Sequence, residues 1–111
     1  MQLTPDTAAV PMATTVHLFS PWMQSGGERV CFSFKYRSNT RKKVYITVEL
    51  ETEKTSRQAG RTSTGRGTTW KKFKAWINIA ERYRVIIKVR IPKQGGNLDM
   101  DDVTFSRNQC A

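Results

Sequence analysis

Side chains that most catalytic and metal centres use are scarce in this sequence. It contains two cysteines, Cys31 and Cys110, and a single histidine, His17. Neither cysteine belongs to a C-x-x-C pair, so the sequence does not favour a zinc site. His17 lies in a strand-like run with no identifiable nucleophile-and-base set, and we therefore expect a non-catalytic protein. Composition alone leaves open whether the cysteines are free thiols or form one disulfide.

Long apolar runs are also lacking. No run approaches the ~20 apolar residues of a membrane-spanning helix, so we expect no insertion into a membrane. The N-terminal stretch 1–19 has neither the basic region nor the apolar region of a signal peptide. If the protein is secreted, we expect its signal to lie outside this sequence.

Acidic residues are few. The 111 residues include 19 Lys and Arg against 9 Asp and Glu, which gives a formal net charge of +10. A chain of this length is expected to form one domain. Its charge favours polyanionic partners such as nucleic acid, heparan-type glycans or an acidic membrane surface. The other interpretation is a basic surface that only keeps the protein soluble.

A helical period is absent as well, and alternation of apolar and polar residues takes its place. The stretch VYITVELE is the clearest example, with Val44, Ile46, Val48 and Leu50 on one face. The same pattern predicts strands over residues 16–19, 29–36, 70–79, 81–92 and 98–106. Short strands with Gly-rich turns are typical of an all-β sandwich, and a jelly roll of two antiparallel sheets is its natural closed form.

Two segments do not follow this pattern. Residues 1–15 are polar and include Pro5 and Pro11, so we expect a flexible N-terminal arm ahead of a sandwich domain over residues 16–111. Residues 52–69 contain no large apolar side chain. We expect mostly loop there, with at most a poorly packed edge strand in the middle.

The order of short motifs over residues 16–110 resembles a MAM domain, a module of meprins, neuropilins and mu-type receptor tyrosine phosphatases. L-F-S-P at residues 18–21 is similar to the L-x-SP element of that family, and Trp70 is similar to the tryptophan that opens a later strand. The other similar segments are C-F-S-F-K-Y at 31–36, Y-R-V-I-I at 83–87, G-N-L-D-M-D-D-V at 96–103, and the closing Cys110.

This resemblance implies an extracellular, non-catalytic module for adhesion or protein–protein contact, homophilic in some members, with a disulfide between Cys31 and Cys110. The sequence departs from the family pattern in the basic segment 90–96 and at its N-terminus. Residues 1–15 cannot supply the additional N-terminal strands and cysteine pair that the family has. Because an incomplete sandwich exposes an unpaired strand edge, we expect a homo-oligomer, formed for example by strand exchange.

Asp99, Asp101 and Asp102 form an acidic cluster in this basic chain. Simple alternation places Asp99 and Asp101 on one face with Val103, and Asp102 on the opposite face beside Met100. Neighbouring carboxylates repel one another and oxygen-rich clusters suit hard cations, so one hypothesis is a site for Ca²⁺ or another cation. The other is that these aspartates pair with nearby Lys and Arg. We expect no other cofactor.

The candidate polyanion-binding residues lie in two predicted strands. They are Lys71, Lys72, Lys74 and Trp76 in one strand and Arg82, Arg84, Lys88 and Arg90 in the other. Alternate side chains along a strand repeat every ~6.6–6.8 Å, a spacing that suits the charges of a sulfated glycan. Nucleic acid is less favoured because the sequence has neither an RNP-type motif nor a recognition helix.

Two other functions remain open at this level. The first is an intracellular β-sandwich with free thiols that binds nucleic acid or another polyanion. The second is a secreted structural or adhesive matrix protein. The state of the two cysteines separates the first alternative from the extracellular ones, because disulfides persist mainly in oxidising compartments.

Overall fold

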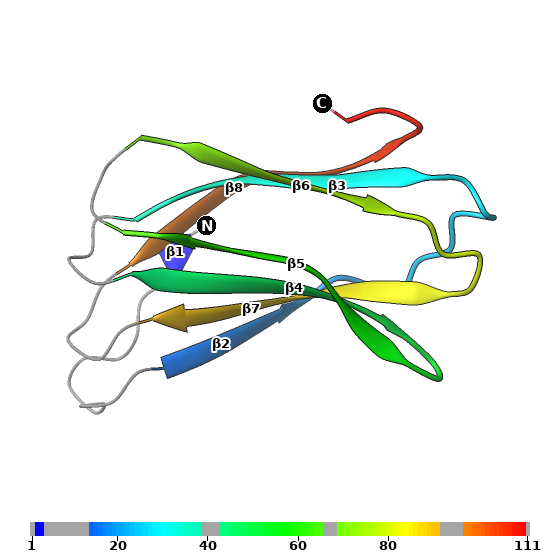
Figure 1. Cartoon of the computed structure of the whole chain (residues 1–111), viewed down its shortest axis with the longest axis horizontal. Coiled ribbons are helices and arrows are strands. Elements are labelled where there is room, and N and C mark those ends of the chain that lie inside the picture. The colour runs from blue at the N-terminus through cyan, green and yellow to red at the C-terminus, as the bar shows by residue number, and fades with distance from the viewer. Residues whose placement is uncertain (1, 4–13, 39–42, 66–68, 92–96, 111) are drawn as a thin grey trace.

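The computed structural model describes residues 2–3, 14–38, 43–65, 69–91 and 97–110, and its regular elements in these ranges are all strands (Figure 1). They are β1 (Gln2–Leu3), β2 (Thr14–Phe19), β3 (Val30–Arg37), β4 (Val44–Thr52), β5 (Ser56–Thr64), β6 (Lys71–Ile77), β7 (Tyr83–Ile91) and β8 (Leu98–Arg107). The predicted all-β class is confirmed. Over the same ranges, no helix has the length and apolar character needed to cross a membrane.

The strands form two antiparallel sheets that lie over one another as two layers (Figure 1). Sheet A has the strand order β1-β8-β3-β6, and sheet B has the order β2-β7-β4-β5. Consecutive strands such as β3 and β4 lie in different sheets, so the chain passes repeatedly from one layer to the other. This arrangement is the predicted jelly-roll sandwich of two antiparallel sheets.

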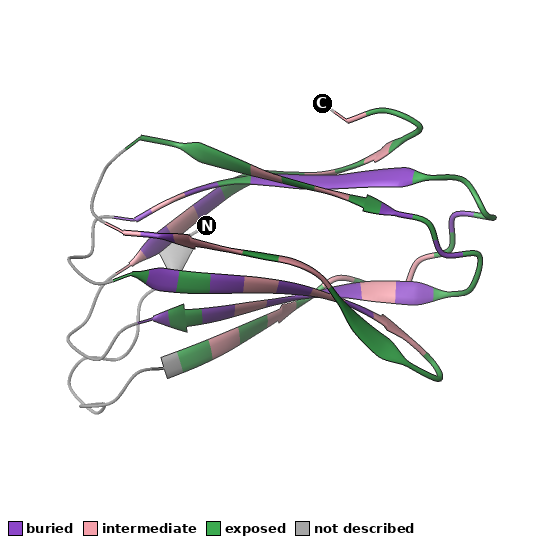
Figure 2. Cartoon of the chain, in the orientation of Figure 1, coloured by how far each residue is buried: buried purple, intermediate pink, exposed green. Residues whose placement is uncertain are grey.

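Alternating side chains build the core between the sheets. Val44, Ile46 and Val48 of β4 are fully buried, whereas Tyr45 between them is exposed. Figure 2 shows the buried positions concentrated on β3, β4 and β7, which lie inside the sheets, and few of them on β5 and β6 at the edges. The period-two pattern read from the sequence therefore identified the core face of these central strands.

The prediction that residues 52–69 are mostly loop is wrong for β5. This strand forms an antiparallel ladder with β4, from Val44 opposite Thr64 to Glu51 opposite Ser56. Backbone hydrogen bonds hold an edge strand without help from large side chains. The small polar residues of β5 also allow this strand to approach the other layer. The hydroxyl of Thr62 on β5 lies 2.8 Å from that of Tyr36 on β3.

The N-terminal boundary differs from the expected one. β1 pairs with β8, with Gln2 opposite Asp99 and Leu3 opposite Leu98. β2 begins at Thr14, two positions before the predicted domain start, and pairs with β7. The expected arm, residues 1–15, thus contains strand residues at both of its ends, and residues 4–13 lie outside the described part of the chain.

A disulfide joins Cys31 of β3 to Cys110, and the two Cα atoms lie 5.1 Å apart. The amide of Asn108 donates a hydrogen bond to the carbonyl of Arg29 at 2.9 Å, so the segment after β8 turns back along β3. Figure 1 shows this turn at the C-terminal end of the chain. The pairing that the family resemblance implied is confirmed.

Reduction of this disulfide should destabilise the fold strongly. The bond closes a sequence separation of 79 residues, and the chain-entropy model gives about 4 kcal/mol for a loop of that size. Urea unfolding with and without reductant measures the change, and the Cys31→Ala/Cys110→Ala variant is the control for reductant effects. Equal midpoints for the oxidised and reduced protein would contradict the expectation.

Gly60 should tolerate alanine poorly. A Cβ atom at Gly60 would lie 2.9 Å from the Cζ atom of Phe73, whose ring stacks on Phe34 with centroids 5.2 Å apart. Overpacking of this kind costs typically about 1–3 kcal/mol. Urea unfolding should therefore show Gly60→Ala to be destabilising.

Gly65→Ala is the matched control, because a Cβ there meets Lys43 at an ordinary 3.7 Å. Combining Gly60→Ala with Phe73→Leu should cost less than the sum of the single changes, since the leucine removes the atoms that clash. Additive costs, or equal effects at Gly60 and Gly65, would disprove the contact as the cause.

Candidate functional site

The outer face of sheet A presents lysines from two neighbouring strands. In the β3–β6 ladder, Lys72 lies opposite Lys35, and Lys74 is the next residue of β6 on the same face. Lys71 lies opposite Tyr36, which is buried in the core, and so falls outside this lysine row. Of the three β6 lysines predicted to act together, the structure places two side by side on one face.

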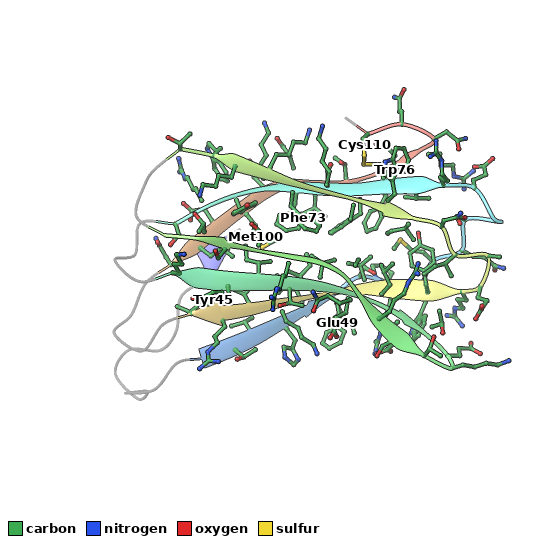
Figure 3. The ribbon with its side chains drawn as sticks, viewed as in Figure 1. Tyr45, Glu49, Phe73, Trp76, Met100 and Cys110 are labelled. Carbon is green, nitrogen blue, oxygen red and sulfur yellow. A yellow bond between two sulfur atoms is a disulfide. The ribbon has the colours of Figure 1, made fainter. Side chains whose placement is uncertain are left out.

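Trp76 also lies on this outer face, as predicted. It is 44% exposed and stands opposite Cys31, beside the disulfide (Figure 3). The guanidinium of Arg29 lies 4.5 Å from its ring centroid, and Arg37 lies 4.4 Å from the ring of Trp70 at the other end of the face. Two cation–π pairs therefore flank the lysines. The predicted binding residues included neither arginine; a usable signal for Arg29 was that it shares the face of Cys31, two positions away.

The acidic cluster is not arranged as simple alternation predicted. The β3–β8 register shifts between Ser33 and Lys35, so that β8 has an extra residue there. Asp102 adopts a φ of 54° at this bulge. The bulge reverses the alternation along β8, so Val103 lines an apolar opening between the sheets while Asp102 reaches Lys35 on the outer face. The predicted placement of Asp102 opposite to the other aspartates is therefore wrong.

Basic side chains engage two of these aspartates. Arg37 Nε donates to Asp99 Oδ2 at 3.0 Å, and Lys35 Nζ lies 3.0 Å from Asp102 Oδ2. Asp101 Oδ1 accepts a hydrogen bond from the amide of Asp102 at 2.8 Å. Among the described residues, no group of three His, Cys, Asp or Glu side chains could hold a metal ion. The geometry matches the ion-pair hypothesis, and a Ca²⁺ site at Asp99, Asp101 and Asp102 stays a prediction.

The basic stripe on β7 lies on the outer face of sheet B, so it does not join the β6 lysines in one site. Glutamates of the neighbouring strand β4 neutralise part of it. Arg84 lies 2.8 Å from Glu51, and Lys88 lies 2.8 Å from Glu49. Arg90 has no ion-pair partner within the described part of the chain. The predicted stripe is therefore basic at one end only.

Aromatic side chains cover the neutralised end of the stripe. The guanidinium of Arg84 lies 4.8 Å from the ring of Phe19 and 4.9 Å from that of Trp22, and Arg82 lies 5.4 Å from Trp22. Arg82 also approaches Glu53 at 4.0 Å, on an exposed part of the surface. These contacts occupy both arginines with neighbouring side chains of the same protein.

The basic end of the stripe forms one wall of an open groove on sheet B. The groove has a volume of about 680 Å³. Its lining residues come from all four strands of the sheet: Thr15, Tyr45, Ile46, Thr47, Arg61, Thr62, Ser63, Lys88 and Arg90. Sequence reasoning did not include Tyr45 or Arg61, because their place beside Arg90 depends on which strands pair.

A second feature is an apolar seam between β2 of sheet B and β8 of sheet A. A cavity of about 150 Å³ opens there, lined by Leu18, Phe19, Ser20, Phe32, Val85, Ile87, Met100, Val103 and Phe105. Phe19, Val103 and Phe105 are exposed large apolar residues at this seam. On that side of β8, β1 covers only Leu98 and Asp99 among the described strands. Within the described ranges, the seam is thus an uncovered edge of the core.

The remaining titratable groups considered do not form a catalytic set. His17 is exposed on β2, with its ring centroid 6.3 Å from that of Phe19. Burial raises the pKa of Tyr83, although the positive charge of Arg107 acts in the opposite direction.

The chain was compared with known proteins. No curated protein matches it. Among 19 matching chains of solved structures is one described as "CBM4 structure and function", with a TM-score of 0.58 and 10% sequence identity, covering 85% of this chain and 73% of that chain. At this identity the likeness shows the sandwich fold alone. The profile of the family described as "MAM domain, meprin/A5/mu" matches residues 2–111. The chain therefore belongs to the MAM family, whose domains are generally extracellular, non-catalytic modules of adhesion and protein interaction.

Proposed function

We propose that this protein is an extracellular contact module that binds a second copy of itself through the apolar seam between β2 and β8. The observation that carries the proposal is the edge of β8 that no described strand covers beyond Asp99, where Val103 is 48% exposed and Phe105 is 37% exposed. An unpaired strand edge beside exposed apolar side chains is a ready surface for strand pairing with another chain.

The sequence of β8 is complementary to itself in an antiparallel pairing. With Thr104 on the two-fold axis, Val103 of one copy lies opposite Phe105 of the other. Such an isologous contact closes as a dimer, and each copy covers the apolar seam of the other.

The disulfide supports both an extracellular location of the protein and the rigidity of this strand edge. Structural disulfides persist in oxidising compartments, which favours an extracellular site over an intracellular protein with free thiols. Cys110 fixes the chain just beyond β8, and the Asn108 amide is bound to the Arg29 carbonyl. A strand edge held at its end loses less conformational entropy when it binds. The same contact would also serve an adhesive or matrix protein.

The net charge of +10 supports an additional affinity for sulfated, heparan-type glycans. Both sheets present basic outer faces, with Lys72 and Lys74 on sheet A and Arg61 and Arg90 on sheet B. Long-range attraction between such surfaces and a polyanion concentrates the protein near glycans and weakens as salt is added.

Sedimentation velocity over the micromolar range tests the dimer. The unaltered protein should form dimers, and Val103→Glu/Phe105→Glu should weaken association by roughly a hundredfold or more, because two desolvated carboxylates would enter the apolar contact. Tyr45→Glu is the control, since Tyr45 is also a large exposed side chain, 54% exposed, but lies on the outer face of sheet B. A monomer at every concentration would refute the proposal.

A further inference from the structure

We propose that the groove on the outer face of sheet B is a binding site for an acidic oligosaccharide, with Arg61 and Arg90 binding its sulfate or carboxylate groups and Tyr45 packing on a sugar ring. This inference deepens the proposed affinity for sulfated glycans and rests on it. Glycan affinity is thereby assigned to one site, which includes Tyr45 and Arg61 from outside the predicted stripe.

The strand register places the groove residues in two rows across the sheet. In the first row, Arg90 of β7 lies between Thr15 of β2 and Tyr45 of β4, and Ser63 of β5 follows Tyr45. In the second row, two residues further along each strand, the order is His17, Lys88, Thr47 and Arg61. Both rows consist of basic, hydroxyl-bearing and aromatic side chains, and neither contains an acid.

Acidic residues begin only in the next rows. Glu49 lies one row beyond Thr47 on β4, and it holds the ammonium of Lys88 at 2.8 Å. Glu51 follows and pairs with Arg84. The outer face of sheet B is therefore divided into a mixed-charge half and a purely basic half, and the groove occupies the basic half.

Arg61 and Arg90 are the cations available to a ligand. Both are exposed, and neither has an ion-pair partner among the residues that the structure describes. Guanidinium groups bind sulfate and carboxylate with two parallel hydrogen bonds. Because no glutamate or aspartate has to be displaced, an acidic group can bind here without breaking an existing pair.

The spacing of these two arginines favours an extended ligand over a single anion. They lie on β5 and β7, with β4 between them, and one row apart along the strands. With ~4.8 Å between strands and ~6.7 Å between rows, their backbones are roughly 12 Å apart. Acidic groups on successive sugars of a chain can each bind one of these guanidiniums, without both side chains having to converge on a single anion.

The other side chains in the groove fit a sugar. Tyr45 is 54% exposed, stands between the two arginine strands, and presents a ring face on which a pyranose can pack. Thr15, Thr47 and Ser63 line the same groove, and each hydroxyl both donates and accepts hydrogen bonds, as sugar hydroxyls require. One aromatic ring among several hydroxyls suits a glycan better than the successive stacking platforms that bind single-stranded nucleic acid.

Isothermal titration with a heparin-derived octasaccharide tests the site. Arg61→Gln/Arg90→Gln should weaken binding roughly tenfold or more, because two charge-assisted contacts are lost. Lys54→Gln/Arg57→Gln is the matched control: it removes the same charge from exposed positions in the β4–β5 turn and at the start of β5, outside the groove, and should weaken binding less than about threefold. Tyr45→Ala should weaken binding while leaving its salt dependence unchanged.

The possible results separate this inference from the function on which it rests. If both double variants weaken binding equally, affinity depends on net charge; the groove is then refuted, and the general affinity for sulfated glycans stands. If the unaltered protein binds no octasaccharide at low salt, both are refuted. A single-stranded oligonucleotide of equal charge that binds as tightly, and that loses affinity in the Arg61→Gln/Arg90→Gln variant, would overturn the glycan as ligand.

Discussion

The pairing of β3 with β8 is the contact on which this structure depends. β3 lies between β6 and β8, and its inward residues Phe32 and Phe34 are buried in the core. β8 comes from the opposite end of the chain, so its ladder with β3 closes sheet A across most of the sequence. The segment after β8 turns back along β3, and the Cys31–Cys110 disulfide fastens it to a residue inside this ladder. Loop-closure entropy opposes so distant a pairing, and the disulfide reduces that cost.

A consequence of this closure is that β8 has one fully paired side and one largely open side. Its inner ladder with β3 continues to Arg107, whereas β1 covers only its first two residues. The bulge at Asp102 then turns Val103 and Phe105 toward the seam. The acidic cluster of the sequence is therefore best understood as part of an edge strand, in which charged residues on the outer face and apolar residues toward the seam mark a contact surface.

The two proposed contacts share one strand but no side chain. β2 contributes Thr15 to the groove on sheet B, and it contributes Leu18 and Phe19 to the seam. A dimer formed along β8 would leave the basic half of sheet B open, so self-association and glycan binding are compatible in space. A dimer would also present two grooves, and two linked sites bind a long polymer more tightly than one site does.

Much of the fold could be predicted because burial acts on each strand separately. The alternation of Val44, Ile46 and Val48 requires a strand with one apolar face, whichever strand lies beside it. The extent of β5 was underestimated for the corresponding reason, although an edge strand in the middle of residues 52–69 was allowed for: its stability comes from backbone hydrogen bonds to β4 and from small side chains, and neither gives an apolar pattern. The bulge at Asp102 likewise depends on the register against β3 and leaves no period in the sequence.

The sequence by itself determined the all-β class, the core faces of β3, β4 and β7, and, through its resemblance to the MAM family, the disulfide. These features follow from local alternation and from motif order. Only the tertiary structure decided which charges meet: the pairing of β4 with β7 gives Lys88 and Arg84 their glutamates, and the pairing of β5 with β4 brings Arg61 into the groove with Arg90. Electrostatic neighbours across a sheet depend on strand order and register, and many registers satisfy the same apolar pattern.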